Sequence, residues 1–223
     1  MLVLIQARMN SKRLPKKVLH KINNQEILKH MFFRIKNCKN NVKLVVATSK
    51  KKSDNPIVNL CKKNRIKFFR GSLNNVASRL LSAANKFKSK YFIRICGDSP
   101  LIDPQIIDRM INISTSKSKR NYDLFSNRLD KSIPSGQRVE IIKTKSMQEA
   151  YKKFFKKGHY EHVTSYFYEN KKKFKIFYTS FKRNKTKIKL SVDTVRDLNK
   201  VKKLVSKLGN NKIANLNYIE KIF

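Results

Sequence analysis

Strand-like and helix-like apolar patterns alternate along the first half of this chain. Short apolar runs predict four strands before residue 98, and stretches with apolar residues on one helical face separate them. The predicted strands cover residues 2–5, 42–47, 66–69 and 91–93, and the predicted helices cover 26–36, 54–64 and a stretch that begins at Asn74 or Asn75. This alternation indicates a parallel sheet with crossover helices. Because the 223 residues contain no linker-like segment, we expect one α/β domain over residues 1–223.

Shorter elements are expected in the second half of the chain. Asp103 followed by Pro104 is typical of a helix start, and this helix is expected to reach residue 113. Further strands are expected over 122–125, 139–142, 174–178 and 188–190, and further helices over 145–155, 160–170 and 195–208. Asp54 is expected to cap the helix over 54–64.

Asp98 follows the predicted strand over 91–93, after a sharp turn that Gly97 allows. In an open α/β sheet, ligands bind outside the carboxyl ends of the strands. A carboxylate there is suited to hold Mg²⁺, with the phosphates of a substrate completing the coordination shell. The alternative is that Asp98 only closes a turn. Asp193 repeats the arrangement, because it lies between the predicted strand over 188–190 and the last predicted helix.

A polar, cation-rich loop over residues 6–19 follows the first strand. Backbone N–H groups and basic side chains can converge on a phosphate in such a loop, where Arg13 offers a planar fork and Lys17 a point charge. The alternative is a basic surface loop in a basic protein. Arg70 follows the third strand at the same edge, and Arg79 on the next helix either points back to this edge or is solvated.

The formal net charge is +39, from 53 Lys and Arg against 14 Asp and Glu. Such a charge is typical of proteins that bind nucleic acid or an anionic membrane surface. However, the excess is mostly lysine at ordinary surface positions, and no zinc-finger, helix-turn-helix or ribonucleoprotein pattern accompanies it. We therefore favour compositional drift over a nucleic-acid partner.

Targeting and redox signals are weak. The apolar run over residues 2–5 is too short for a signal-peptide core or a membrane span, so no membrane partner is expected. Cys38, Cys61 and Cys96 fit no zinc spacing and no disulfide framework. A reducing cytoplasm is the expected location.

Several short motifs occur in an order that resembles the cytidylyltransferase family, in its spore coat polysaccharide biosynthesis protein F branch. The motifs lie at residues 6–19, 47–48, 54–57, 70–72, 94–104, 134–136, 139–140, 161–164 and 192–194. This branch is related to enzymes that make CMP-activated acidic sugars. The resemblance implies a three-layer nucleotide-diphospho-sugar transferase fold with a mixed, mainly parallel central sheet. It also implies that a sugar oxygen attacks the α-phosphate of CTP and that pyrophosphate leaves.

The resemblance assigns expected roles to residues of this chain. The residues implied in nucleotide binding are Gln6, Ala7, Arg8, Asn10, Ser11, Arg13, Lys17, Arg70, Gly71, Arg94 and Gly97. The implied catalytic residues are Arg13, Lys17, Asp98 and Asp193, and the two aspartates are the implied Mg²⁺ ligands. The expected sugar-side residues are Arg138, Glu140, Glu161 and His162. Related enzymes also suggest a homodimer built on the segment over 121–170.

His162 has two interpretations. It could orient the sugar or help to deprotonate the nucleophile. Equally, it could pack against Tyr166 in a helix.

The chain departs from the family pattern at several positions. Asn10 and Lys16 stand where the family has glycine, Asn75 stands where it usually has an acidic residue, and Arg138 stands where it has aspartate. Asparagine tolerates left-handed backbone, whereas lysine is harder to accommodate there. The reversed charge at Arg138 predicts an anionic acceptor, such as a carboxylate-bearing sugar.

Three functions therefore remain open on the sequence. The first is a Mg²⁺-dependent cytidylyltransferase that makes a CMP-sugar for surface polysaccharide or glycan. The second is a transferase of the same fold that uses another nucleotide, and the third is a non-catalytic basic protein that binds nucleic acid.

Overall fold

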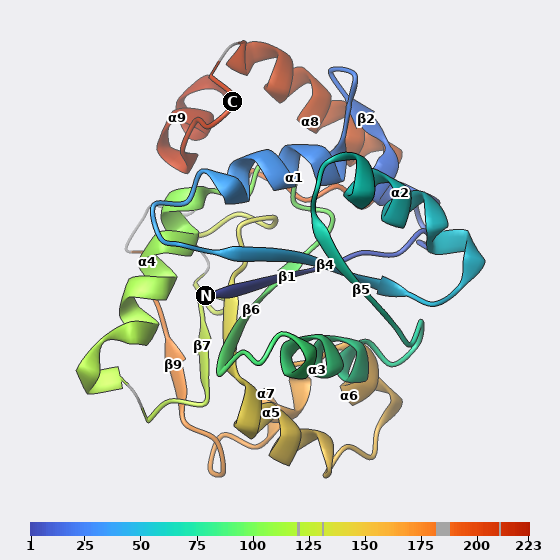
Figure 1. Ribbon diagram of the computed structural model, residues 1–223. Helices are drawn as coiled ribbons and strands as arrows, with labels where there is room; N and C mark the ends of the chain where they lie inside the picture. Colours follow the sequence, from blue (N-terminus) through green and yellow to red (C-terminus); the bar gives the residue numbers. More distant parts are fainter. Residues whose placement is uncertain (120, 131, 182–187, 210) are drawn as a thin grey trace.

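The computed structural model describes residues 1–119, 121–130, 132–181, 188–209 and 211–223. Within these residues, seven strands form one mixed sheet in the order β5-β4-β1-β6-β8-β7-β9 (Figure 1). The strands are β1 (Leu2–Gln6), β4 (Lys43–Ser49), β5 (Lys67–Gly71), β6 (Tyr91–Cys96), β7 (Leu124–Ser126), β8 (Glu140–Lys143) and β9 (Ile176–Tyr178). The pairs among β5, β4, β1 and β6 are parallel, as the alternation predicts. Strand β8 runs antiparallel to β6 and β7, which makes the sheet mixed.

Helices cover both faces of the sheet, so the fold has three layers (Figure 1). One face carries α1 (Ile27–Lys36), α2 (Asn55–Lys63), α4 (Pro104–Thr115), α8 (Val195–Leu208) and α9 (Leu216–Ile222). The other carries α3 (Val76–Lys86), α5 (Thr144–Tyr151), α6 (Lys157–Glu161) and α7 (Ser165–Glu169). A small hairpin of β2 (Lys21–Ile22) and β3 (Gln25–Glu26) precedes α1. The three-layer, mainly parallel architecture expected from the sequence is confirmed.

Strand β1 shows why the central strands are continuously apolar. Val3 and Ile5 pack into the core beneath α1, whereas Leu2 and Leu4 pack into the core against α3. Successive side chains of a strand point to opposite faces, so a strand covered on both faces must be apolar at every position. This burial places the polar residues that follow β1 at the edge of the sheet, where the strand ends.

Most predicted elements are confirmed to within a few residues. Helix α8 spans the predicted range, and Thr194 and Asp197 form a capping box at its start. The Asp103 side chain accepts a hydrogen bond from the Gln105 amide at the start of α4, and Pro104 occupies the first turn.

The single helix predicted over 160–170 is wrong. The structure has two short helices, α6 and α7, and the chain leaves helical geometry at His162 (φ −100°, ψ 58°). Two buried residues follow this break, and one of them, Thr164, donates a hydrogen bond to Glu140 on β8. A tertiary contact that sequence periodicity does not report therefore interrupts the helix.

The strand predicted over 188–190 is also not formed as such. Lys189 makes one isolated bridge with Ser135. The Leu190 amide donates to the Ser135 carbonyl, and the Val192 amide donates to the Asp98 carbonyl. The segment is thus pinned to two loops at the edge of the sheet and adds no strand to it.

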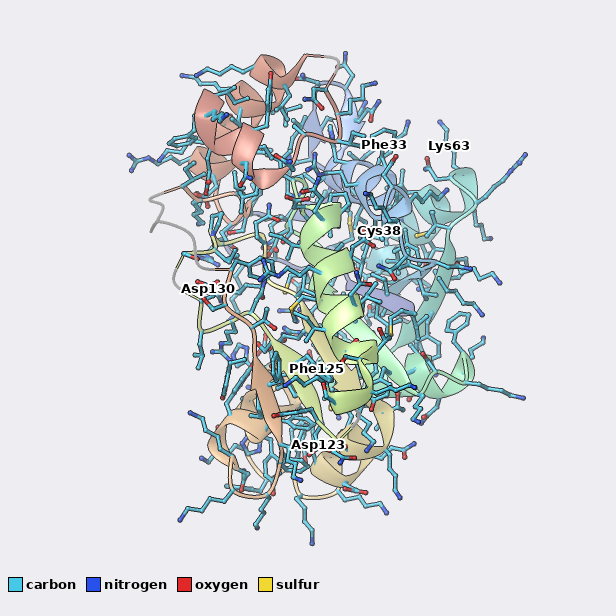
Figure 2. All side chains as sticks on the ribbon, turned by 90° about the vertical axis from the view of Figure 1, so that its left-hand side faces the viewer. Phe33, Cys38, Lys63, Asp123, Phe125 and Asp130 are labelled. Carbon is cyan, nitrogen blue, oxygen red and sulfur yellow. The ribbon has the colours of Figure 1, made fainter. Side chains whose placement is uncertain are left out.

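Charged side chains project from the surface in many directions. Figure 2 shows nitrogen-tipped side chains projecting outward on every visible side, whereas Phe125 of β7 lies in the interior. None of the helices in the described ranges is long and apolar enough to cross a membrane.

Candidate active site

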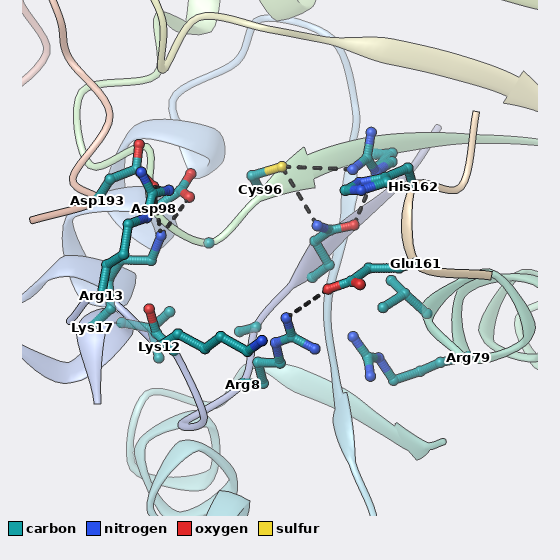
Figure 3. A pocket seen from close by; sticks show the side chains of 17 residues that line it. Arg8, Lys12, Arg13, Lys17, Arg79, Cys96, Asp98, Glu161, His162 and Asp193 are labelled. Atoms are coloured by element: carbon teal, nitrogen blue, oxygen red, sulfur yellow. Dashed lines mark hydrogen bonds and ion pairs between the residues drawn. The ribbon is translucent and has the colours of Figure 1, made fainter. Parts of the chain in front are cut away.

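A cavity of about 390 Å³ lies at the carboxyl ends of β1 and β6 (Figure 3). It gathers most of the residues that the sequence nominated. The nominated residues that line it are Gln6, Ala7, Arg8, Ser11, Arg13, Lys17, Arg94, Gly97, Asp98, Glu161, His162 and Asp193. The cavity therefore lies at the edge of the sheet where the carboxyl ends of the parallel strands meet, as the sequence predicted for a ligand site.

Lys17 joins the two aspartates. Its Nζ donates to Asp98 Oδ2 at 2.8 Å and to Asp193 Oδ1 at 3.2 Å. Arg13 and Lys189 also contact the Asp193 carboxylate, at 2.9 Å and 3.3 Å. Burial opposes ionisation of Asp193, but Lys17 and Lys189 hold the pKa of its carboxyl below the ordinary value. Burial likewise disfavours the charged Lys17, yet Asp98 and Asp193 raise its pKa above the ordinary value. Asp193 is thus stabilised as a carboxylate and Lys17 as an ammonium.

Backbone contacts bring these distant segments together. Gly97 donates its amide to the Gln6 carbonyl at 2.9 Å, and a Cβ on Gly97 would lie 2.8 Å from that same oxygen. The turn before Asp98 can therefore pass so close to the end of β1 only because residue 97 is glycine. The bond from the Val192 amide to the Asp98 carbonyl then places Asp193 beside Asp98.

The Asp54 side chain holds the cation-rich loop in place. Its buried carboxylate accepts hydrogen bonds from the Met9 amide (2.8 Å), the Ser49 amide (3.0 Å) and the Thr48 hydroxyl (3.0 Å). The side chain therefore does not cap α2, contrary to the sequence prediction. It ties the loop to the end of β4.

Lys16 adopts left-handed backbone (φ 57°) where the family pattern has glycine. Its amide donates to the Met9 carbonyl at 2.9 Å and closes the loop just before the 3-10 turn Lys17–Leu19. The family glycine thus matches a conformational requirement that this chain meets with a strained lysine.

Replacing Lys16 by glycine is expected to leave stability unchanged or to raise it by up to about 1 kcal/mol, because relief of left-handed strain offsets the entropy of glycine. Lys12→Gly in the same loop is the control, because Lys12 has no positive φ. It should lower the free energy of unfolding by about 0.5–1 kcal/mol. Urea denaturation of both variants is the measurement, and equal losses would contradict the argument.

A second cavity of about 320 Å³ adjoins the first and shares Arg94, Cys96 and His162 with it. Its other lining residues are Arg128, Arg138, Glu140, Thr164 and Ser165. The Arg128 guanidinium stacks 4.8 Å from the ring centre of Tyr168. In the described part of the chain, Arg128 and Arg138 make no ion pair. Two unpaired guanidinium groups therefore face this cavity.

Glu140 and Arg94 form a buried ion pair between the two cavities, with Nη1 and Oε2 at 2.5 Å. Thr164 and Tyr168 also donate to Glu140, at 2.9 Å and 2.6 Å. Burial works against ionisation of Glu140, but Arg94 and these donors hold the pKa of its carboxyl below the ordinary value. Arg94 in turn donates to Gln6 Oε1 at 2.9 Å. Both side chains are thus occupied by protein partners.

Glu161 is the last residue of α6, and His162 follows it at the break before α7. Arg8 donates to Glu161 Oε1 at 3.0 Å, so a residue nominated for the nucleotide side pairs with one nominated for the sugar side (Figure 3). His162 is exposed and lines both cavities. His159 is the histidine that packs against Tyr166, with ring centres 5.1 Å apart.

Three nominated residues lie outside both sets of lining residues. Asn10 is exposed in the loop. Arg70 donates to the Ser49 and Lys51 carbonyls, each at 2.9 Å. Gly71 lies beneath Arg79, which does point into the cavity.

Lys12 and Arg128 were not nominated from the sequence. Lys12 lies inside the cation-rich loop and lines the first cavity. Its position in that loop is the sequence feature that could have indicated a role in the site. Arg128 belongs to none of the motifs, so no sequence feature indicated that it would line a cavity.

The donor set of the first cavity suits Mg²⁺ in part. Asp98 and Asp193 supply carboxylate oxygens that already converge on one ammonium group. The described residues contain no group of three or more His, Cys, Asp or Glu that could hold a metal. Mg²⁺ commonly takes one or two carboxylates and completes its shell with water and substrate phosphates, so two aspartates fit that mode and no protein cage is needed.

Comparisons with known proteins point to one family. The cytidylyltransferase family model matches residues 2–222. The chain is 37% identical to the uncharacterized protein MJ1063 of Methanocaldococcus jannaschii over 198 residues, which cover 87% of this chain and 78% of that protein. It is 28% identical to the spore coat polysaccharide biosynthesis protein SpsF of Bacillus subtilis over 218 residues, which cover 93% and 87% of the two chains.

Solved structures show the same fold. A cytidylyltransferase from Leptospira borgpetersenii superposes with a TM-score of 0.93 at 30% identity, covering 99% of this chain and 92% of that one. CMP:2-keto-3-deoxy-manno-octonic acid synthetase, in complex with CTP, superposes with a TM-score of 0.69 at 15% identity and covers 92% and 98%. The chain therefore belongs to the cytidylyltransferase family.

Proposed function

We propose that this nucleotidyltransferase moves CMP from CTP to a sugar acceptor and releases pyrophosphate, for the synthesis of a surface polysaccharide or another glycan. The observation that carries the proposal is the convergence of Asp98 and Asp193 on Lys17, beside the cation-rich loop. An acceptor oxygen forms a bond to the α-phosphorus of CTP, the bond to the bridging oxygen breaks, and pyrophosphate takes the electron pair. The name of the Bacillus subtilis relative supports the polysaccharide assignment.

The roles that we propose for the residues follow from their charges. Lys12, Arg13 and Lys17 supply cations for the triphosphate, because negative charge grows on the leaving pyrophosphate. Asp98 and Asp193 would hold Mg²⁺, which when bound acts as a Lewis acid and a template. His162, at the junction of the two cavities, is placed to orient the acceptor or to take its proton.

The second cavity supports an anionic acceptor. Among the residues that the structure describes, Arg128 and Arg138 have no ion-pair partner, and the Glu140 carboxylate is already held by Arg94, Thr164 and Tyr168. A planar guanidinium binds a carboxylate with two parallel hydrogen bonds. A carboxylate-bearing sugar therefore suits this site better than a neutral one.

Thermal melting with each nucleoside triphosphate and Mg²⁺ tests the nucleotide. A ligand that binds only the folded state raises the melting temperature, so CTP should give the largest rise. Pyrophosphate release should then follow when a sugar acid is added with CTP. A larger rise with UTP or GTP would favour a same-fold transferase with another nucleotide. Salt-sensitive DNA binding without any nucleotide effect would favour the nucleic-acid reading.

Replacing Arg138 by aspartate, the residue of the family pattern, is expected to lower kcat/KM for a carboxylate-bearing sugar by about tenfold to a hundredfold, because an attractive charge becomes repulsive. 2-Keto-3-deoxy-manno-octonic acid is a suitable probe, with a neutral sugar for comparison. Arg65→Asp makes the same charge change outside both cavities and serves as the control. Efficient turnover of the neutral sugar alone by the unmodified protein would contradict the prediction.

A further inference from the structure

Gln137 is a buried amide that joins the loop before β8 to the segment after Asp98. Its side chain is 0% exposed. Nε2 donates to the Leu101 carbonyl at 2.6 Å, and Oε1 accepts from the Asp103 amide at 2.7 Å. One side chain thus holds both ends of the segment over 101–103, which begins three residues after Asp98.

The same loop also contacts the segment that leads to Asp193. The Leu190 amide donates to the Ser135 carbonyl at 2.9 Å, and the Ser135 and Ser191 hydroxyls form a hydrogen bond of 2.9 Å. Gly136 has a positive φ of 95°, and a Cβ there would lie 2.6 Å from the Leu190 carbonyl carbon. The loop can therefore pack backbone to backbone against this segment only because residue 136 is glycine.

Arg138 follows this loop directly and is an exposed residue between two buried ones, Gln137 and Val139. Asn127 holds the backbone on both sides of it. Asn127 Nδ2 donates to the Gln137 carbonyl and Oδ1 accepts from the Val139 amide, each at 2.9 Å. Asn127 is itself 1% exposed and precedes Arg128. One hydrogen-bonded unit therefore carries both guanidinium groups of the second cavity.

We infer that Gln137 is a positioning residue. It fixes the turn of Asp98 relative to the Arg138 guanidinium, and so aligns an anionic acceptor in the second cavity with the α-phosphate in the first. Gln137 lines neither cavity, so it acts through the residues that it holds. The reacting atoms must lie about 3–3.5 Å apart and in line, and a misplacement of about 1 Å can cost about 10²-fold in rate. The inference rests on the proposed function, because it needs CTP in one cavity and the acceptor in the other.

The first test is Gln137→Met, which keeps the length of the side chain and removes both bonds. It should lower kcat/KM for 2-keto-3-deoxy-manno-octonic acid at least about tenfold. The Kd for CTP, measured by calorimetry with Mg²⁺, should stay unchanged. Rates are expressed per molecule that binds CTP, so that loss of folded protein does not imitate the effect. An unchanged kcat/KM, or an equal loss of CTP affinity, would overturn the inference.

Thr144→Val is the matched control for loss of a buried hydrogen bond. The buried Thr144 hydroxyl also donates to a carbonyl, that of Ser89 at 2.6 Å, and it lines neither cavity. This variant should keep the kcat/KM of the unmodified protein even if its stability falls.

A double-mutant cycle tests whether Gln137 acts through Arg138. In protein that already carries Arg138→Met, the change Gln137→Met should lower kcat/KM by less than about twofold, because the guanidinium that Gln137 positions is gone. Additive losses would show that Gln137 acts elsewhere and would overturn the inference.

Gln137→Glu keeps the test possible if Gln137→Met does not fold. A protonated carboxyl has the shape of the amide and can make both bonds, and burial raises the pKa of a carboxyl. The ratio of its kcat/KM to that of the unmodified protein should therefore rise as the pH is lowered. A ratio that does not change with pH would overturn the inference.

The outcomes also separate this inference from the proposed function. Normal turnover by Gln137→Met would overturn the inference alone. If no sugar acid stimulated pyrophosphate release from CTP by the unmodified protein, the proposed function would fall and the inference with it.

Discussion

Asp98→Asn is expected to lower the rate of pyrophosphate release from CTP by about 10²–10³-fold, the usual effect of removing one charge-stabilising group from such a site. Asp193→Asn should have an effect of the same size. Each change removes one of the carboxylates that hold Lys17 and that would hold Mg²⁺. The rate of pyrophosphate release, measured across a series of Mg²⁺ concentrations, is the readout.

Both variants should remain folded, because Asp98 and Asp193 are only partly buried. Glu149→Gln is the control for loss of one carboxylate, since Glu149 is exposed on α5 away from both cavities. Its rate should equal that of the unmodified protein. The change in melting temperature on adding Mg²⁺ with CTP gives a second readout that needs no turnover, and it should shrink in both aspartate variants. Full activity of either would remove that residue from the proposed metal site.

Glu140→Gln is expected to lower the free energy of unfolding by about 3–5 kcal/mol, because it leaves the Arg94 guanidinium buried without its counter-charge. Urea denaturation near neutral pH is the measurement. Glu161→Gln breaks the half-exposed pair with Arg8 and serves as the control. Exposed pairs contribute about 0–1 kcal/mol, so its loss should be small. Similar losses in the two variants would show that the Arg94–Glu140 pair is not a main support of the fold.

The cost of Glu140→Gln should depend on pH. Burial opposes ionisation of Glu140, but Arg94 and two hydroxyl donors hold its folded pKa below the ordinary value. A depressed carboxyl pKa contributes stability above the unfolded pKa, about 4.3, and loses it as pH falls through the folded pKa. The difference between the unmodified protein and the variant should therefore be full near neutral pH and shrink in acid. If the difference in the free energy of unfolding stayed constant across this pH range, the folded pKa of Glu140 would not be lowered.

Local patterns were sufficient for the elements whose ends are chemically marked. Helix α8 matches its predicted span because Thr194 and Asp197 cap it within one turn. Strand β1 could be predicted because both of its faces are buried, which makes its apolar run continuous. The helix predicted over 160–170 failed, since Thr164 bonds to Glu140, which lies 24 positions earlier in the chain.

The position of Asp98 at the edge of the sheet that carries the first cavity followed from sequence, because Asp98 comes just after β6 in the parallel part of the sheet. Asp193 lies beside it for a tertiary reason, since the strand predicted over 188–190 is not formed and the Val192 amide bonds to the Asp98 carbonyl. Which side chains pair at that edge was decided only by the tertiary structure. Arg94 pairs with Glu140, whereas Arg79 is buried and has no carboxylate partner in the described part of the chain. Sequence specifies residue type and local periodicity, whereas pairing depends on distances between segments that are far apart in the chain. Those distances exist only once the sheet and its two helical layers have packed.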